Sequence, residues 1–172
     1  PMLELEQLNV EEIINSVSTK LSSLKNANKI KDPALIGIRR GGVWIGKRIS
    51  EQCFPADRFG ELNIAYYRDD FRRIGLHPTV EPSELPFDIE GRDVILFDDI
   101  LHTGRTIRAA MNEIFDFGRP NSIFLVVLLD RGGRELPISP DISGINMELS
   151  DKYHVKIENN NSIEFKVFER LE

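Results

Sequence analysis

Hydrophobic residues recur along the chain with two different spacings, which together predict alternating helices and strands. From residue 9 to about residue 25 they lie three or four positions apart, which gives a helix one apolar face. Asn9 and Glu12 stand where a capping box would start this helix. The alternation predicts an α/β domain with a central, mainly parallel sheet flanked by helices. Uninterrupted apolar runs, typical of strands covered on both faces in a parallel sheet, occupy residues 34–38, 94–97 and 123–129.

Weaker signals complete this pattern. An asparagine-rich turn near the end of the chain separates two alternating segments and predicts a terminal hairpin. Gly118 gives the expected stop for the helix that precedes it. Further helices are predicted at residues 43–53 and 107–117, and further strands at residues 62–67, 153–157 and 163–168.

A polar segment from about residue 68 to residue 91 is broken by prolines and predicts a long excursion from the sheet. We interpret it as a lid loop or hairpin over the C-terminal edge of the sheet. The chain has 172 residues, which suits a single domain over residues 1–172.

Charge and composition narrow the class of protein. The formal net charge of −6 and a pI near 5.2 argue against a surface built mainly to hold nucleic acid. Cys53 is the only cysteine, and we expect it to be buried and chemically silent in a reducing compartment. The first ten residues lack the pattern of a signal peptide, and no apolar run is long enough to span a bilayer. We therefore expect a cytoplasmic protein without a membrane partner.

The candidate chemistry lies at residues 93–106, DVILFDDILHTGRT. Asp98 and Asp99 fall at the C-terminal end of a buried strand, the edge of an open α/β sheet where ligands bind. Alone, the two acids suit either a pair of vicinal hydroxyls, with a metal held through water, or a cap on the next helix. The Thr103–Thr106 turn favours a phosphorylated sugar, because hydroxyls, a glycine and a helix N-terminus can bind phosphate. The chain contains no Walker A loop and no G-x-G-x-x-G fingerprint.

The string VILFDDILHTGRT resembles the phosphoribosyl diphosphate motif of type I phosphoribosyltransferases. Within that family the chain is most similar to the pyrimidine operon regulators that are also uracil phosphoribosyltransferases. The likeness covers most of the chain and rests also on GIRRGGVWIGKRI at 37–49, LNIAYYRDD at 62–70, ELPFDIEG at 84–91 and LLDRGGRELPI at 128–138.

The resemblance implies transfer of a phosphoribosyl group from phosphoribosyl diphosphate to uracil, with Mg2+, giving UMP and pyrophosphate. Asp98 and Asp99 would bind the ribose hydroxyls, stabilise charge during catalysis and meet the metal through water. The other residues implied for phosphoribosyl diphosphate are Leu101, Thr103, Gly104, Arg105 and Thr106. Those implied for pyrophosphate are Arg39, Arg40 and Gly41, with Arg72 and Arg73 from the excursion sharing the role. Those implied for uracil are Val127, Asp130, Arg131 and Arg134.

Two positions depart from the family pattern. Many relatives carry Thr-Arg-Gly where this chain has Arg40, Gly41 and Gly42, so the arginine stands one place earlier. His102 replaces the acidic or tyrosine residue expected before Thr103. Its imidazole could accept a proton from the base, but we favour a solvent-facing residue of the turn.

Two alternatives to uracil transfer remain at this point. One is an RNA-binding attenuator that senses UMP, but the first helix carries only Lys20 and Lys25 where such relatives are arginine-rich. The other is transfer to a different base, such as hypoxanthine or orotate. The apolar helix faces also suggest a homodimer or a higher homo-oligomer.

Overall fold

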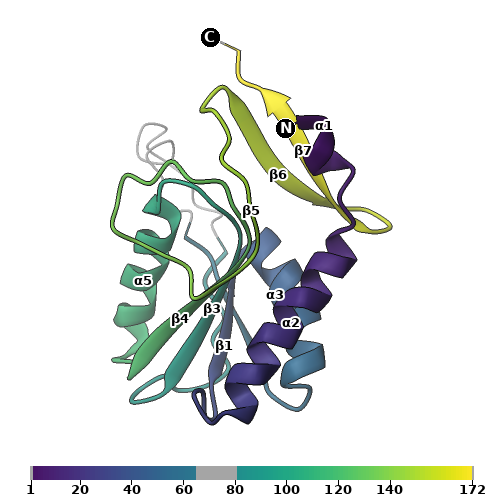
Figure 1. Cartoon of the computed structure of the whole chain (residues 1–172). Coiled ribbons are helices and arrows are strands. Elements are labelled where there is room, and N and C mark those ends of the chain that lie inside the picture. The colour runs from purple at the N-terminus through teal and green to yellow at the C-terminus, as the bar shows by residue number, and fades with distance from the viewer. Residues whose placement is uncertain (1, 65–80, 172) are drawn as a thin grey trace.

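The central layer of the molecule is a five-stranded sheet with strand order β2-β1-β3-β4-β5 (Figure 1). In this computed structural model, which describes residues 2–64 and 81–171, every neighbouring pair in that sheet is parallel. The prediction of an α/β fold with a central parallel sheet is therefore confirmed. The strands are β1 (Ala34–Ile38), β2 (Phe59–Leu62), β3 (Asp93–Leu101), β4 (Ser122–Asp130) and β5 (Ile142–Asn146).

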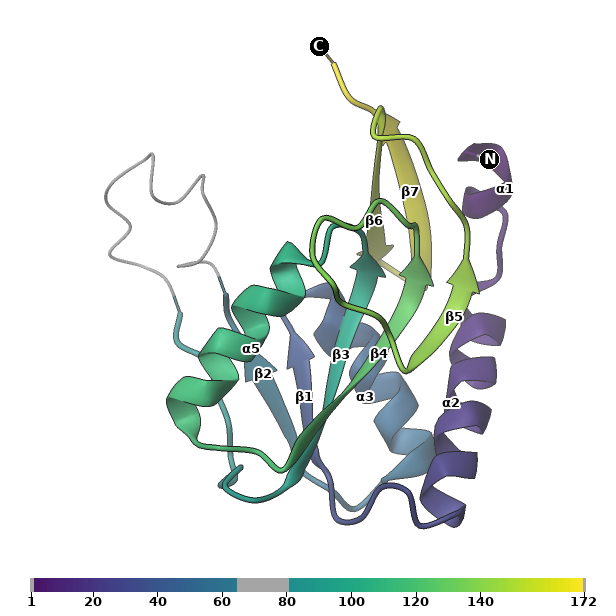
Figure 2. The same ribbon diagram turned by 60° about the vertical axis from the view of Figure 1, so that its left-hand side comes forward.

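Helices cover both faces of this sheet, as predicted. Helices α2 and α3 pack on one face and α5 packs on the other (Figures 1 and 2). Two separate apolar clusters result, one around Ile14 and Ile45 and the other around Ile107 and Ile114. No helix within the described residues is both long and apolar enough to cross a membrane. The helices are α1 (Met2–Glu6), α2 (Val10–Asn26), α3 (Gly41–Cys53) and α5 (Arg105–Phe117).

The predicted start of the first long helix and the predicted burial of the cysteine are both confirmed. Asn9 is the N-cap of α2, and its side chain accepts a hydrogen bond from the Glu12 amide at 3.3 Å. Cys53 is 3% exposed, and its Sγ lies 3.2 Å from the Ser18 carbonyl oxygen. The Asn9 cap therefore defines the start of α2, and the thiol at the end of α3 packs against the middle of α2.

The terminal hairpin is also confirmed, with strands longer than predicted. Strands β6 (Tyr153–Asn159) and β7 (Ile163–Glu169) form a separate antiparallel sheet. The hairpin stands beyond the C-terminal ends of the parallel strands (Figure 2). Its apolar side joins the core cluster of α2 and α3, and Glu6 accepts a hydrogen bond from the Val167 amide at 2.9 Å. The hairpin is thereby fixed over the edge where the sheet's ligands are expected.

Three details differ from the sequence prediction. Strand β2 begins at Phe59 and ends at Leu62, so it lies earlier than the predicted strand, whose Tyr66 falls outside the described residues. Strand β5 and helix α1 were not predicted. Residues 68–80 of the predicted excursion also lie outside the described residues, and residues 81–91 form only an isolated antiparallel bridge between Glu84 and Glu61.

Candidate functional site

A cavity of about 300 Å³ opens at the C-terminal edge of the sheet, below the terminal hairpin. Three chain segments that are far apart in the sequence meet there: the loop before α3, the end of β3 and the hairpin. Of the residues predicted for the site, this cavity brings together Arg39, Arg40, Gly41, Asp98, Asp99, His102, Thr106 and Arg131. The C-terminal edge of the sheet is therefore the candidate site, as the strand pattern predicts.

The two acids lie inside β3 rather than after it, because the strand continues to Leu101. Asp98 is 5% exposed, and its Oδ1 accepts a hydrogen bond from the Asp99 amide at 2.9 Å. Asp99 Oδ1 accepts from the Ile100 amide at 2.7 Å. The N-cap of the following helix is Gly104, which receives no side-chain cap. The alternative that these acids cap the helix is therefore wrong, and their carboxylates border the cavity.

The turn between β3 and α5 is held by its own hydrogen bonds. Gly104 has a φ of +95°, a left-handed conformation that glycine adopts without strain. The Arg105 amide donates to Thr103 Oγ1 at 3.1 Å, while Arg105 Nε binds Glu135 Oε1 at 2.8 Å. Helix α5 starts directly after this turn, so its first amides and positive dipole end face the same edge as the acids. The arrangement suits a phosphate group.

The loop before α3 approaches the acids closely. A Cβ atom on Gly41 would lie 2.1 Å from Asp99 Oδ2, so no larger residue fits there without displacing that carboxylate. The Arg39–Arg40 peptide bond in this loop is cis. Arg40 is the N-cap of α3 and its side chain is exposed. The loop therefore presents main chain and a cation directly beside the acids.

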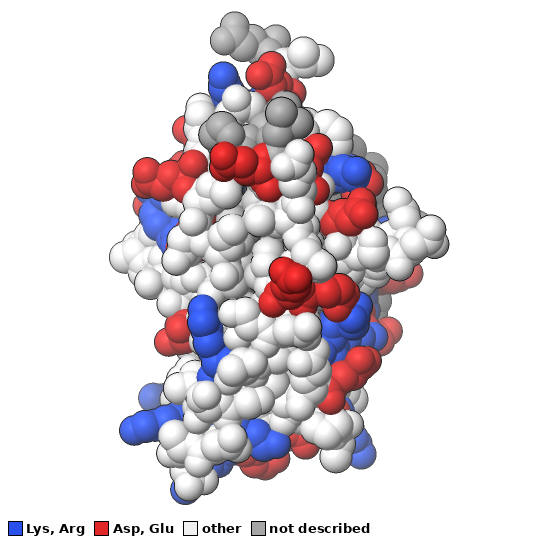
Figure 3. Space-filling view, turned by 45° about the vertical axis from the view of Figure 1, so that its right-hand side comes forward, with Lys and Arg blue, Asp and Glu red and all other residues white. Residues whose placement is uncertain are grey.

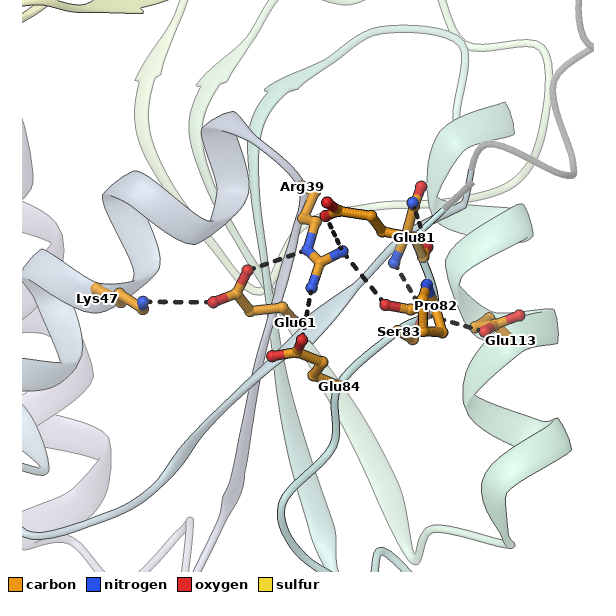
Figure 4. Close-up of polar contacts among 9 residues, drawn as sticks. Arg39, Lys47, Glu61, Glu81, Pro82, Ser83, Glu84 and Glu113 are labelled. Atoms are coloured by element: carbon orange, nitrogen blue, oxygen red, sulfur yellow. Dashed lines mark hydrogen bonds and ion pairs between the residues drawn. The ribbon is translucent and has the colours of Figure 1, made fainter. Parts of the chain in front are cut away.

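The Arg39 guanidinium points into a cluster of carboxylates (Figure 4). Its Nε donates to Glu61 Oε1 at 3.0 Å, and its Nη1 donates to the Pro82 carbonyl oxygen at 3.2 Å. Arg72 and Arg73, which were predicted to share the binding of pyrophosphate, lie outside the described residues. Two further carboxylates lie near the guanidinium, Glu81 at 3.5 Å and Glu84 at 3.8 Å.

Of the four residues predicted for uracil, only Arg131 lines the cavity. Val127 is fully buried in the middle of β4. Arg134 binds Asp130 Oδ2 at 2.6 Å, the Ile138 carbonyl oxygen at 2.7 Å and the His102 carbonyl oxygen at 2.9 Å. The Arg134 hydrogen bond holds the pKa of Asp130 below its usual value, although burial opposes it. This pair therefore holds the loop after β4 in place.

Arg131 is a buried cation at the wall of the cavity. It is 2% exposed, and its Nη2 donates to the Ser150 carbonyl oxygen at 2.9 Å. Its Nε has no hydrogen-bond partner among the described residues. Burial, together with the nearby Arg170, lowers the pKa of Arg131, whereas Asp151 raises it. A buried donor at a cavity wall favours a ligand that carries oxygen atoms.

His102 differs from the solvent-facing residue that we favoured. Its side chain is only 22% exposed, and its Nε2 lies 3.3 Å from Asp151 Oδ1. Its Nδ1 lies 2.9 Å from the Gly132 carbonyl oxygen. A carbonyl oxygen accepts hydrogen bonds, so this contact places a hydrogen on Nδ1. The ring connects the end of β3 to the loop after β4.

Sequence reasoning missed the contribution of the hairpin to the site. Burial, followed by the charges of Arg170, Arg131 and Lys156, lowers the pKa of His154. The alternation of β6 and β7 predicts a hairpin but does not reveal where it packs. Four cavity-lining residues come from β6 or directly follow β7, namely His154, Val155, Lys156 and Arg170. Lys156 and Arg170 add positive charge to the cavity that the two acids line.

Comparison with known proteins identifies the family. A model of the phosphoribosyl transferase domain matches residues 4–158. The Bifunctional protein PyrR of Nitrosococcus oceani is 46% identical over 162 residues, which cover 93% of this chain and 92% of that protein. The Bifunctional protein PyrR of Pseudomonas syringae pv. tomato is 46% identical over 149 residues, covering 87% of this chain and 88% of that protein.

Solved structures agree with the observed fold. A hypoxanthine phosphoribosyltransferase from Trypanosoma cruzi superposes with a TM-score of 0.61 and 24% identity, covering 82% of this chain and 75% of that chain. The same kind of enzyme from Staphylococcus aureus gives a TM-score of 0.64 and 22% identity, covering 86% of this chain and 78% of that chain. At such identities these structures support the fold alone. On the strength of the domain match and the close curated relatives, the chain belongs to the phosphoribosyltransferase family and, within it, to the PyrR proteins.

Proposed function

We propose that this protein transfers the 5-phosphoribosyl group of phosphoribosyl diphosphate to uracil, giving UMP and pyrophosphate. One observation carries the proposal: Asp98, Asp99, the N-terminus of α5 and the loop at residues 39–41 all meet at one cavity. These parts match the three portions of phosphoribosyl diphosphate, namely ribose hydroxyls, 5-phosphate and pyrophosphate. The membership in the PyrR proteins supports uracil as the base.

Each part of the cavity has a task in this reaction. The carboxylates of Asp98 and Asp99 accept hydrogen bonds from the two ribose hydroxyls. They also stabilise the positive charge that grows at C1 of the ribose as its bond to pyrophosphate breaks. Thr103 and the first amides of α5 bind the 5-phosphate, which fixes the ribose between acids and turn.

Mg2+ fits this site as an ion shared with the substrate. Within residues 2–64 and 81–171 no group of three or more His, Cys, Asp or Glu side chains is arranged to hold a metal ion. Two neighbouring carboxylates suit Mg2+ nonetheless, because this ion keeps several waters and binds substrate phosphates alongside one or two acids. Asp98 and Asp99 would hold it through water, and when bound it would neutralise the leaving pyrophosphate.

The proposal assigns uracil to the side of the cavity near the hairpin. Arg131 supplies a buried donor for a carbonyl oxygen of the base. Val127 does not contact the base in this arrangement, because it is fully buried within β4. Asp130 and Arg134 act indirectly, since their ion pair holds the loop that carries Arg131.

RNA binding has less support in this chain than catalysis. Lys20 Nζ donates to the Ser143 carbonyl oxygen at 3.3 Å, and Lys25 Nζ donates to the Cys53 carbonyl oxygen at 2.6 Å. The lysines of α2 are thus directed toward the protein. Lys and Arg are also interspersed with Asp and Glu on the face seen in Figure 3, without a continuous basic patch. Phosphate backbones require such a patch.

A base panel tests the proposal. We expect pyrophosphate release and UMP formation with phosphoribosyl diphosphate, Mg2+ and uracil, and little release with hypoxanthine or orotate. Absence of turnover with uracil, or preference for another base, would overturn the assignment of the substrate.

The acids provide a second test of the same proposal. Asp99→Asn keeps the size of the side chain but removes its charge, so we expect kcat to fall by about 100-fold or more, the range of one electrostatic group. Asp116→Asn, on the exposed end of α5, serves as the matched control and should leave kcat unchanged. Equal kcat values for Asp99→Asn and the native protein would contradict the role of the acids.

A further inference from the structure

Glu61, at the end of β2, holds two cations with one carboxylate. Its Oε1 accepts from Arg39 Nε at 3.0 Å, and its Oε2 lies 3.3 Å from Lys47 Nζ (Figure 4). Burial raises the pKa of the Glu61 carboxyl, but the hydrogen bonds and charges of Arg39 and Lys47 outweigh burial and lower it. The Glu61 side chain is 25% exposed and that of Arg39 is 16% exposed. Their ion pair is therefore shielded from water better than an ordinary surface pair.

Every nitrogen of the Arg39 guanidinium is directed into this cluster. Nε faces Glu61, Nη1 faces the Pro82 carbonyl oxygen and Glu81, and Nη2 faces Glu84. To contact a substrate phosphate, Arg39 would have to leave all of these partners and strand the partly buried Glu61 charge. Removing one partner of such a pair costs more than the pair itself contributes.

Main-chain hydrogen bonds reinforce the same connection. The Arg39 amide donates to the Leu62 carbonyl oxygen at 2.9 Å. Glu61 and Glu84 exchange two backbone hydrogen bonds, each of 2.8 Å. The loop at residues 39–41 is thus fastened, through side chain and main chain, to the end of β2 and to residues 81–84.

Arg40, the next residue of the loop, is not held by this cluster. The Arg40 side chain is exposed at the cavity and has no hydrogen bond or ion pair within the described part of the chain. It directly precedes Gly41, which touches the Asp99 carboxylate. Arg40 is therefore the cation of this loop that can turn to a substrate without breaking a contact to residues 2–64 or 81–171.

We propose that the two neighbouring arginines have separate tasks, which rests on the proposed phosphoribosyl transfer. Arg39 is a positioning residue that Glu61 holds, and it does not contact pyrophosphate. Arg40 is the side chain that binds pyrophosphate. Glu61, which no motif indicated, thereby becomes a residue that supports catalysis through the shape of the loop.

Lysine substitutions separate the two tasks. Arg40→Lys keeps a mobile positive charge, so we expect the KM for phosphoribosyl diphosphate to change by less than about threefold. Arg39→Lys cannot reproduce three directed contacts from one planar group, so we expect the same KM to rise by about tenfold. The KM for uracil should change little in either variant. A KM for phosphoribosyl diphosphate in Arg39→Lys equal to that of the native protein would overturn the proposal.

A double-mutant cycle tests whether Arg39 acts through Glu61. Glu61→Gln should weaken the binding of Mg2+-phosphoribosyl diphosphate, measured by calorimetry, by about tenfold. Adding Arg39→Lys should then cost little more, because the two residues share one interaction. Adding Arg40→Lys to Glu61→Gln should instead weaken binding by the product of the two single-variant factors, because these residues act independently. Additive losses for Arg39→Lys and Glu61→Gln would refute the coupling.

Two controls keep this result separate from misfolding and from failure of the proposed function. Glu11→Gln removes another carboxylate that pairs with an arginine of α3, Arg48, and should leave substrate binding unchanged. If Glu61→Gln does not fold, Glu61→Asp is measured in its place. The proposal would be overturned if both Glu61→Asp and Arg39→Lys bound Mg2+-phosphoribosyl diphosphate as tightly as the native protein does. Turnover by the native protein decides the proposed function on its own, whereas the cycle compares variants of a protein that already binds substrate.

Discussion

His102 joins two loops through both nitrogens of its ring. Nδ1 donates to the Gly132 carbonyl oxygen and Nε2 lies 3.3 Å from the Asp151 carboxylate, so both nitrogens of the ring face protein oxygen atoms. Gly133 lies against the ring, since a Cβ there would come within 2.6 Å of it. These contacts favour a role in holding the loop after β4 over a role in proton transfer.

Replacement of His102 tests this interpretation. His102→Phe should preserve the shape of the pH-rate profile while lowering kcat/KM a few-fold, because the loop at Gly132 loses its anchor. His77→Phe is the matched control, as a histidine for which no task is proposed. Loss of one limb of the profile in His102→Phe alone would instead indicate a general base.

At the residue scale, the sequence indicated which candidate residues gather at one edge of the sheet, but not which contacts their side chains make. Asp98, Asp99 and the turn after them were visible because motif, strand end and helix start coincide in one segment. The hydrogen bonds of the Arg134 and His102 side chains could not be predicted from the sequence. Each is made to a main-chain oxygen atom about 30 residues away. Motifs specify residue types, whereas such contacts depend on how separate loops pack.

Helix α3 and strand β3 approach each other through glycine. A Cβ on Gly42 would lie 2.4 Å from the Phe97 carbonyl oxygen, which belongs to the backbone of β3 and cannot rotate away. The close approach brings the start of α3, and with it the loop at residues 39–41, to the two acids. Packing of these two elements therefore determines the width of the cavity.

We expect Gly42→Ala to lower the free energy of unfolding by about 1–3 kcal/mol, because the extra methyl must push helix from strand. Urea denaturation of the variant and the native protein measures this difference. Glu51→Ala, on the exposed side of the same helix, should stay within about 0.5 kcal/mol. A native-like midpoint for Gly42→Ala would contradict the close packing.

At the scale of elements, long periodic segments were predicted well and short edge segments were not. The predicted helices and buried strands are present because each shows an unbroken period. Strand β5 was missed because its sequence ISGIN has no apolar run, and Gly144 is needed where α2 crosses it. Strand β2 was placed too late, because the alternation at Leu62 and Ile64 continues past the strand's actual end.

The whole molecule depends on several ionised carboxylates for its stability. The Ser122 and Asn121 hydrogen bonds lower the pKa of Asp93, while hydrogen bonds and charges also lower those of Glu61 and Asp130. Carboxyls whose pKa falls on folding contribute stability above their unfolded values of about 4, and this contribution is lost as the pH falls further. The protein should therefore become less stable in acid.

Denaturation in urea at a series of pH values measures this dependence. We expect the free energy of unfolding to be nearly constant from pH 7 to about pH 5 and to fall below about pH 4. Ser122→Ala, at the start of β4 beside Asp93 and far from the cavity, should make the acid slope shallower by returning the Asp93 pKa toward its usual value. An acid slope that does not change in this variant would contradict the role assigned to Asp93.

At the scale of the molecule, the sequence predicted one α/β domain but not how the terminal hairpin completes it. The pairing of β6 with β7 is local in the sequence, and the asparagine-rich turn between the two strands predicts it. Its packing on α1 and α2, and over the cavity, involves residues up to 161 positions apart in the chain. Such distant contacts leave no periodic signal, so Lys156 and Arg170 could not be assigned to the site from the sequence.

The hydrogen bonds between residues 61–63 and 81–84 have a consequence for the evolution and engineering of this fold. Besides the exchange between Glu61 and Glu84, the Asn63 amide donates to Ser83 Oγ at 2.9 Å, and Asn63 Nδ2 donates to the Glu81 carbonyl oxygen. The chain on the two sides of residues 65–80 is thus joined directly by hydrogen bonds. Closing a flexible segment of twice the length costs only about 0.6 kcal/mol. We therefore expect the register of β2 with β1 to depend on the contacts of residues 61–63 and 81–84 more than on the length of the chain between them.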